Sequence, residues 1–271
     1  MISEKPIVSI FGSSARPFLW DKLIKSLEKE TLSFEIIYTG PAPINLDPRV
    51  RYIKSFFKPT QCMQISALFA KGDFLLHIVD DLIFCENKPL TKLLDEYKQN
   101  YQNKEVILST KLKRNGIKYD DNNYFLYKND QNSFIPISLF IKKSFFLELG
   151  GFDKSFITCM ADADLIYRAV SSNKAAFYFS NVFVEEDKSV TKITLFDIYG
   201  YRDLNKLIKF WFNNEIFIIE KRPTLKPYNK ILLKRNSPNG IWLVNSQFLI
   251  NIYKYFLYKY YRIKNILIKY V

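Results

Sequence analysis

Short apolar runs alternate with amphipathic segments along the first two thirds of the chain. The apolar, β-branched runs predict strands, and segments with apolar residues three and four positions apart predict helices. The expected strands are 7–11, 34–38, 50–53, 74–79, 105–109 and 134–141. The expected helices are 20–30, 63–70, 88–99, 143–149 and 162–171. This alternation predicts an α/β fold with a largely parallel sheet, whose ligands bind beyond the carboxyl ends of the strands.

Three further stretches have a distinct pattern. Residues 115–133 are rich in Asn, Asp, Lys and Tyr, which predicts a long surface loop or hairpin. Residues 199–220 predict a helix whose apolar side chains either pack on the core or line a binding site. Residues 241–271 contain no Gly, Pro or acidic residue and predict a basic amphipathic helix.

Composition excludes several classes of protein. The 271 residues are 48% hydrophobic and 25% charged, with 8 Gly and 11 Pro, so the chain is neither collagen-like nor disordered. Cys62, Cys85 and Cys159 form no CxxC pair, so we expect neither a disulfide scaffold nor a structural zinc site. His77 lies within an apolar strand and predicts a satisfied core histidine. Without a leader-like N-terminus or an apolar run of about 18 residues, a cytoplasmic location is expected.

The positive charge is concentrated in the C-terminal third. Of the net charge of +13, residues 1–187 carry +1 and residues 188–271 carry +12. This asymmetry predicts a catalytic or binding domain over residues 1–187. It is joined to a basic segment over residues 188–271 that binds an anionic partner, such as a membrane surface, nucleic acid or an acidic substrate. Helix 241–271 would either lie on an anionic membrane surface or pack on that domain with its charges in solvent. No recognised nucleic-acid motif is present, so we do not expect nucleic acid as a partner.

Two acidic clusters are the candidate chemistry. Asp80 and Asp81 follow an apolar strand, where they suit a metal ion or ligand, although paired aspartates are also common in turns. Asp162 and Asp164 open a predicted helix, where aspartate is an ordinary helix cap. Asp164 and Arg168 stand four residues apart on that helix and are expected to pair with each other. Taken singly, each cluster has a structural explanation.

The clusters and their surroundings resemble a known pattern. Ala70-Lys71-Gly72-Asp73-Phe74, followed by Asp80-Asp81, resembles the AxGxY strand and DxD element of family 2 glycosyltransferases with the GT-A fold. Leu149-Gly150-Gly151-Phe152-Asp153, followed by Asp162-Ala163-Asp164-Leu165 and Arg168, is similar to the GGFDE…EDxDLxxR block of that family. The resemblance extends over residues 6–190, and its second block is the more specific one.

The resemblance implies a role for each matching residue. The fold would be a Rossmann-like, mixed and mostly parallel sheet, with residues 1–187 as the catalytic domain that binds a nucleotide-sugar. Asp162 would be the general base of an inverting transfer, with Asp164, Arg168, Gly150 and Gly151 in support. A divalent cation, Mn²⁺ or Mg²⁺, would be held by Asp81, with Glu186 or Asp187 in place of the family's histidine. The donor, a UDP-sugar first among the candidates, would meet Asp80. Because the carboxyl end of the first strand faces the site, it would also meet Gly12, Ser13, Ser14 and Arg16, unless these residues form an ordinary β-to-α loop.

The resemblance also implies a biological setting. The acceptor would be a glycan or a lipid-linked glycan of a bacterial surface polysaccharide, and residues 188–271 would form the acceptor side. Such an enzyme would work in the cytoplasm or peripherally on the inner face of the membrane.

Several departures from the family pattern keep a second hypothesis open. Tyr38-Thr39-Gly40 supplies no aspartate to bind the nucleotide base, Ala161 replaces the acid that precedes the base, and the family's later histidine is missing. These changes are what an inactive relative that serves as a binding or scaffold module would show. A nucleic-acid-binding protein that uses the basic third is the third and weaker alternative.

Overall fold

The computed structural model describes residues 5–41, 46–114, 117–118 and 138–187, together with residues 199, 200, 202, 203, 206, 207 and 210. The strands are β1 (Val8–Ser13), β2 (Phe34–Gly40), β3 (Val50–Lys54), β4 (Phe74–His77), β5 (Leu82–Phe84), β6 (Glu105–Arg114), β7 (Ile117–Lys118), β8 (Leu139–Lys142) and β9 (Ala175–Glu186). A short 3-10 helix at Pro17–Leu19 precedes α1 (Trp20–Lys25), α2 (Pro59–Phe69), α3 (Pro89–Asn100), α4 (Lys143–Glu148) and α5 (Ala161–Ser171).

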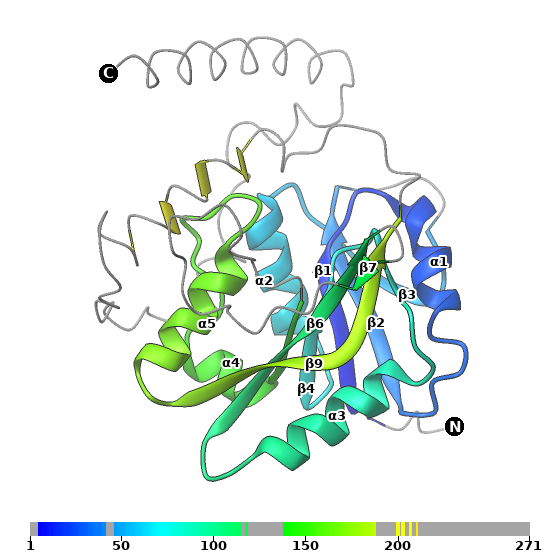
Figure 1. Cartoon of the computed structure of the whole chain (residues 1–271). Helices are drawn as coiled ribbons and strands as arrows, with labels where there is room; N and C mark the ends of the chain where they lie inside the picture. Colours follow the sequence, from blue (N-terminus) through cyan, green and yellow to red (C-terminus); the bar gives the residue numbers. More distant parts are fainter. Residues whose placement is uncertain are drawn as a thin grey trace.

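The strands of the described residues form one nine-stranded mixed sheet (Figure 1). Its order is β3-β2-β1-β4-β8-β6-β9-β5, and β7 pairs with β6. The β3–β2, β2–β1, β1–β4 and β6–β9 ladders are parallel. β8 is antiparallel to both of its neighbours, β4 and β6, and β5 is antiparallel to β9. Most paired residues therefore lie in parallel ladders, and the predicted mixed, mostly parallel α/β fold is confirmed.

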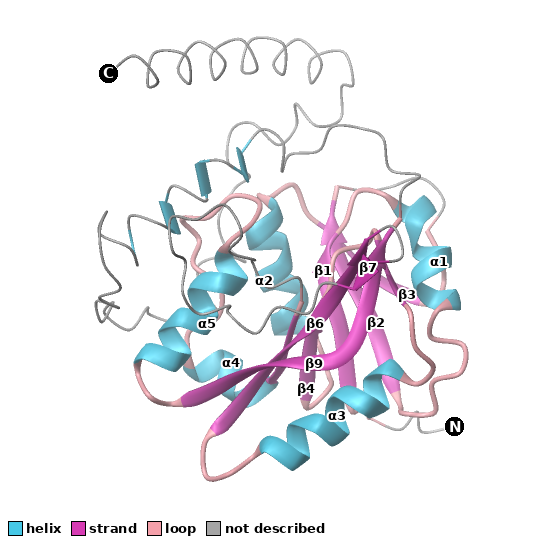
Figure 2. Ribbon diagram, viewed as in Figure 1, coloured by secondary structure: helices cyan, strands magenta, loops and turns pink. Residues whose placement is uncertain are grey.

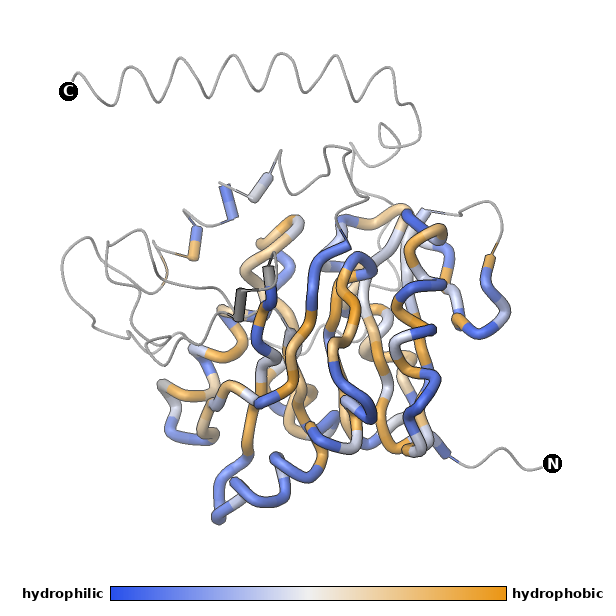
Figure 3. The backbone as a smooth tube through the Cα atoms, turned by 45° about the vertical axis from the view of Figure 1, so that its right-hand side comes forward, coloured by the Kyte–Doolittle hydropathy of each residue, from blue (hydrophilic) through white to orange (hydrophobic). Residues whose placement is uncertain are grey.

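Helices cover both faces of this sheet and bury a separate apolar cluster on each (Figure 2). Because side chains alternate along a strand, Phe11 of β1 lies in the cluster under α2, α4 and α5, whereas Val8 and Ile10 lie in the cluster under α1 and α3. Figure 3 shows the resulting concentration of hydrophobic residues along the sheet. This two-sided burial explains why the strands read as short continuous apolar runs.

The predicted elements are found where the structure describes them, with differences at the ends. The helix expected over 20–30 ends at Lys25, and the helix expected from Met63 begins at Pro59, because proline suits the first turn of a helix. Strands β5 and β9 were missed. β5 has three residues, and the pattern of β9 is interrupted by the polar pair Ser180-Asn181, close to a register shift against β6.

The C-terminal region is described at only a few positions. Among them, Leu207 is 2% exposed within the cluster under α5, and the Phe210 ring meets that of Phe156 at 5.9 Å, so core packing is confirmed for this part of the expected helix 199–220. The basic helix 241–271, most of the expected loop 115–133 and the proposed boundary at residue 188 lie outside the described residues. Within the described residues, no helix combines the length and apolarity needed to cross a bilayer.

Candidate active site

The loops after β1 and β4 leave the sheet side by side. These strands are parallel neighbours with Phe11 opposite His77, and the Ile78 N–H continues the ladder by donating to the Phe11 carbonyl at 3.2 Å. Their carboxyl ends therefore deliver residues 12–16 and residues 78–81 to one edge of the sheet, where α/β proteins bind ligands.

Asp80 anchors the loop after β1. Its carboxylate is 2% exposed and accepts hydrogen bonds from the Ser14 hydroxyl at 2.6 Å and from the Arg16 guanidinium through two of its nitrogens. Trp20 Nε1 also donates to the Ser14 hydroxyl at 3.1 Å, and the Trp20 ring stacks on Tyr38. Burial raises the pKa of Asp80, although Arg16 and Ser14 act in the opposite direction. Asp80 thus fixes Ser14 and Arg16, both predicted donor-site residues.

Arg16 links both aspartates of the first cluster. Its Nη1 lies 3.1 Å from Asp81 Oδ2, while its other nitrogens bind Asp80. Burial opposes the charge of Arg16, but the attraction of Asp80 and Asp81 outweighs burial and raises the pKa of the guanidinium. The side chain is 24% exposed, so a fixed positive charge faces the open side of the site.

Asp81 is the carboxylate of this cluster with room for a cation. Its side chain is 25% exposed, and among the described residues Arg16 contacts one of its two oxygens. Asp187 lies next to it through a backbone hydrogen bond of 2.7 Å to the Asp81 carbonyl, but the Asp187 carboxylate pairs with Lys22 at 2.8 Å. If a divalent cation binds here, as the resemblance implies, Asp81 would supply one carboxylate oxygen and the other ligands would have to come from outside this cluster.

The other predicted metal ligands line an adjoining pocket. An open pocket of about 450 Å³ lies beside β5 and β9 and is bounded by Ile83, Phe84, Cys85, Lys113, Glu185, Glu186 and Asp187. Within the part of the chain that the structure describes, no three His, Cys, Asp or Glu side chains converge in a metal-binding group.

Asp162 is buried at the first turn of α5. It is 8% exposed, and its Oδ1 accepts the Ala163 N–H at 2.9 Å. Burial raises the pKa of Asp162 to about 6, although the backbone hydrogen bonds to its carboxylate lower the pKa in part. Met160, just before the helix, has a φ of +66°, a conformation that costs a residue with a side chain of the order of 1–3 kcal/mol. The turn that presents Asp162 is therefore held in place by its surroundings.

One of these supports is the buried pair that the sequence predicted on α5. Arg168 Nε donates to Asp164 Oδ2 at 3.0 Å, which confirms the pairing. The same guanidinium donates to the carbonyls of Leu149 and Gly151, the latter at 2.5 Å. Gly150 and Gly151 have φ of +82° and +68°, as expected for glycines that end α4. Arg168 thereby joins the two halves of the Gly150–Arg168 block.

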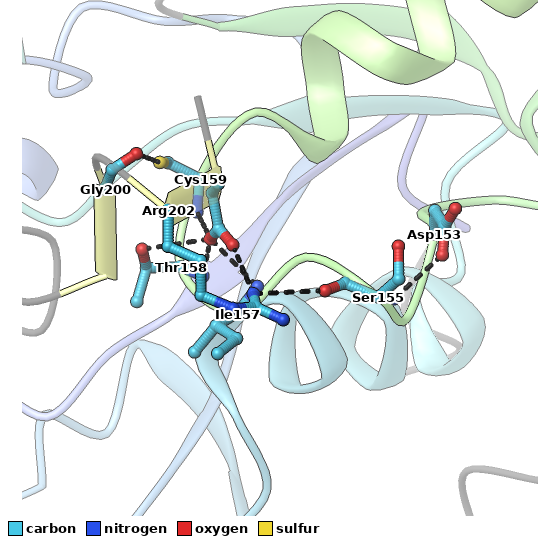
Figure 4. A network of polar contacts seen from close by, with 8 residues as sticks. Asp153, Ser155, Ile157, Thr158, Cys159, Gly200 and Arg202 are labelled. Atoms are coloured by element: carbon cyan, nitrogen blue, oxygen red, sulfur yellow. Dashed lines mark hydrogen bonds and ion pairs between the residues drawn. The ribbon is translucent and has the colours of Figure 1, made fainter. Parts of the chain in front are cut away.

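A second support comes from beyond residue 188 (Figure 4). The Asp203 carboxylate is fully buried and accepts the N–H groups of Ile157, Thr158 and Cys159 at 2.9, 2.7 and 3.2 Å. Its other oxygen accepts from Arg202 at 2.8 Å. We call Asp203 with these three N–H groups the loop clamp. Sequence analysis missed it because a single aspartate in a basic segment looks like a solvated charge.

His77 departs from expectation in one respect. It is 3% exposed, as predicted for a core histidine, but the expected hydrogen-bond satisfaction is wrong, because within the described residues neither ring nitrogen has a hydrogen-bond partner. Its Nδ1 lies 3.9 Å from Asp162 Oδ2. Since His77 ends β4 and Asp80 follows it by three residues, Asp162 and Asp80 both lie near the carboxyl end of β4.

No family model and no curated protein matches this sequence. Solved structures do match. TarS 1-349 of S. aureus has a TM-score of 0.52 at 12% identity, over 77% of this chain and 66% of that one. Its complex with UDP-GlcNAc scores 0.52 at 13% identity, over 77% of this chain and 67% of that one. The mannosyltransferase PcManGT from Pyrobaculum calidifontis, in complex with GDP-Man and Mn²⁺, scores 0.56 at 10% identity, over 85% and 69%.

The chain has the GT-A fold. At 10–13% identity the likeness shows the GT-A fold alone, and this chain spans about two thirds of the length of each of these three structures. The fold implied by the sequence resemblance is therefore confirmed, while the roles of the individual site residues stay predictions.

Proposed function

We propose that this protein is a glycosyltransferase that moves a sugar from a nucleotide-diphosphate sugar to an acceptor hydroxyl. The observation that carries the proposal is that two acidic clusters, about 80 residues apart in sequence, both lie near the carboxyl end of β4 of a GT-A fold. The matched structures support the same donor class, since they are complexes with UDP-GlcNAc and with GDP-Man.

Residues 12–16 and Asp81 form the proposed donor side. The Arg16 guanidinium is held in place by Asp80, so it could donate hydrogen bonds to a diphosphate without having to be reordered on binding. A divalent cation bound at Asp81 would neutralise charge on the leaving diphosphate. Glu186 and Asp187, beside the open pocket, are the proposed further ligands or substrate contacts.

Asp162 is the proposed general base. With a pKa of about 6, raised by burial, it is mostly ionised at neutral pH and still basic enough to accept a proton. The acceptor oxygen bonds to the anomeric carbon as its proton passes to Asp162. The bond from that carbon to the diphosphate oxygen breaks with its electron pair, and the nucleotide diphosphate leaves. A single displacement of this kind inverts the anomeric centre.

The remaining assignments complete the proposal. Residues 1–187 form the catalytic domain, and residues 188–271 contribute the acceptor side. The loop clamp joins the two regions, because Asp203 binds the backbone of Ile157–Cys159. The acceptor would be a glycan or lipid-linked glycan, and helix 241–271 would contact an anionic membrane surface on the cytoplasmic side.

One observation favours a second candidate, an inactive GT-A protein that binds a partner. Arg16 already neutralises Asp80 and one oxygen of Asp81, as a bound cation would in an active site. Such a protein would keep the fold while losing metal-dependent chemistry.

Release of nucleotide diphosphate from UDP-, GDP-, CDP- and dTDP-sugars distinguishes the two candidates. The wild type is expected to consume one donor class in the presence of Mn²⁺ and a glycan acceptor. Asp162→Asn is expected to lower kcat by about 10²–10⁴-fold while nucleotide binding persists. The matched control Asp95→Asn, at an exposed position of α3, keeps full activity. A fully active Asp162→Asn variant would refute the base, and a wild type that neither binds nor consumes any donor favours the second candidate.

A further inference from the structure

His77 is a buried polar residue that the fold does not explain. Buried imidazole nitrogens normally have a hydrogen-bond partner, because leaving one unpaired costs about 1–3 kcal/mol. In the described part of the chain both nitrogens of His77 lack one, on a strand whose other buried side chains are apolar. A phenylalanine or leucine would fill the same space without that cost.

The surroundings of His77 direct it towards Asp162. The rings of Phe11 and Phe152 lie 5.5 and 5.6 Å from the imidazole and enclose it with apolar surface. Among the described residues, Asp162 is the titratable side chain within ion-pair distance of His77. Burial, together with nearby charges that include Asp162, raises the pKa of Cys159. Asp162 Oδ1 accepts the Ala163 N–H, which leaves Oδ2 facing His77 Nδ1.

We propose that His77 is a positioning residue for the base, whose Nδ1–H donates to Asp162 Oδ2 and holds the carboxylate ionised and oriented in the working site. This inference deepens the proposed function and rests on it. The separation of 3.9 Å is about 1 Å longer than a hydrogen bond, and such contacts in ligand-free sites tighten when substrate binds.

The protonation states agree with a neutral donor and a charged acceptor. Burial lowers the pKa of His77 to about 4, so the imidazole is neutral at pH 7 and carries one N–H. Burial raises the pKa of Asp162, and a hydrogen bond to the carboxylate opposes that rise. His77 would therefore extend the pH range over which the base is ionised.

The first test uses the fact that His77 is the sole histidine of the sequence. In an untagged protein labelled with ¹⁵N-histidine, every imidazole signal belongs to His77, and its ¹⁵N shifts report which nitrogen carries the proton. We expect the Nδ1–H tautomer in the wild type. In Asp162→Asn the amide NH₂ takes the place of Oδ2, so Nδ1 must accept and the tautomer changes to Nε2–H. An Nε2–H tautomer in both proteins, with and without bound nucleotide, overturns the proposal.

The second test compares two variants across pH. His77→Phe keeps the ring and removes the donor, whereas His77→Asn places an amide N–H near the position of Nδ1. We expect His77→Phe to move the acidic limb of kcat/KM upwards by about one pH unit, which is about fivefold lower activity at pH 6 and about tenfold at lower pH, with the donor KM unchanged. His77→Asn should restore the limb. An unchanged limb in His77→Phe contradicts the proposal.

The two tests separate this inference from the proposed function. If Asp162→Asn retains full activity, the assignment of the base fails whatever His77 does. If Asp162→Asn is inactive while His77→Phe behaves as the wild type, this inference alone fails. The tautomer measurement needs a bound nucleotide but no turnover, so it tests the contact even if no sugar is transferred.

Discussion

Replacing Asp162 by asparagine should make the protein inactive and more stable. An aspartate whose pKa is higher in the folded than in the unfolded state binds more protons when folded, so stability falls as pH rises through that interval. For Asp162 the interval runs from the ordinary value of 3.8 to about 6. Asparagine has no charge to bury, keeps the acceptor for the Ala163 N–H, and offers an N–H to His77.

The expected size of the effect follows from that interval. Each pKa unit corresponds to about 1.36 kcal/mol, so the buried charge of Asp162 costs the wild type about 3 kcal/mol above pH 6. At pH 4 and below this cost is largely absent, because the folded state holds Asp162 protonated. The stability gained by Asp162→Asn should therefore be small at pH 4 and grow to about 3 kcal/mol by pH 7.

Urea unfolding from pH 4 to 8 measures this difference directly. Asp95→Asn serves as the control, because its exposed carboxylate should give a difference from the wild type that does not vary with pH. A pH-independent difference for Asp162→Asn, or a variant less stable than the wild type at pH 7, would refute the argument that Asp162 is a destabilising buried charge.

Two further substitutions test the framework around the site. Arg16→Gln leaves the buried Asp80 carboxylate without its cation and should lower the free energy of unfolding by about 3 kcal/mol, measured by urea unfolding; Arg16→Lys should recover part of this loss. Asp203→Ala leaves the three N–H groups of the loop clamp unpaired and should cost roughly 3 kcal/mol or more, with faster amide hydrogen exchange at Ile157–Cys159; unchanged exchange there would contradict the clamp.

Hydrophobic periodicity predicted the fold because the central strands are buried on both faces. Each such strand is a continuous apolar run bounded by turn residues, and each helix has one apolar side, so local patterns mirror the layers. β5 and β9 were not predicted from these local patterns. They are defined by their pairing with each other and, for β9, with β6, contacts that no local window of sequence contains.

The candidate site was predictable in its residue types but not in its contacts. Asp80, Asp81 and Asp162 were found because, together with their surroundings, they resemble the motifs of family 2 glycosyltransferases. The roles of Arg16, which joins two aspartates, and of Asp203, which clamps a loop 44–46 residues earlier, depend on tertiary distances. His77 looked like core packing because its neighbours in sequence are apolar, while the carboxylate within ion-pair distance of it, Asp162, lies 85 residues away on α5.

The loop clamp gives the region after residue 188 a defined connection to the site. Asp203 binds the three N–H groups that immediately precede the strained Met160 and the helix that presents Asp162. A displacement of Asp203 would therefore shift Asp162, the proposed base, because Asp162 follows the clamped Cys159 by three residues. An acceptor that binds to the C-terminal region would be well placed to affect the base in this way.

The most direct test of the donor site is a thermal-shift measurement with UDP, GDP, CDP and dTDP, each with and without Mn²⁺, on the wild type and Asp81→Ala. A ligand that binds the folded state stabilises it by about 2.7 kcal/mol at a hundredfold excess over its dissociation constant. We expect one nucleotide to raise the melting temperature of the wild type in a Mn²⁺-dependent manner, and Asp81→Ala to lose that shift. Equal melting temperatures of the wild type with every nucleotide, with and without Mn²⁺, would contradict the proposal that this GT-A fold binds a nucleotide-sugar donor.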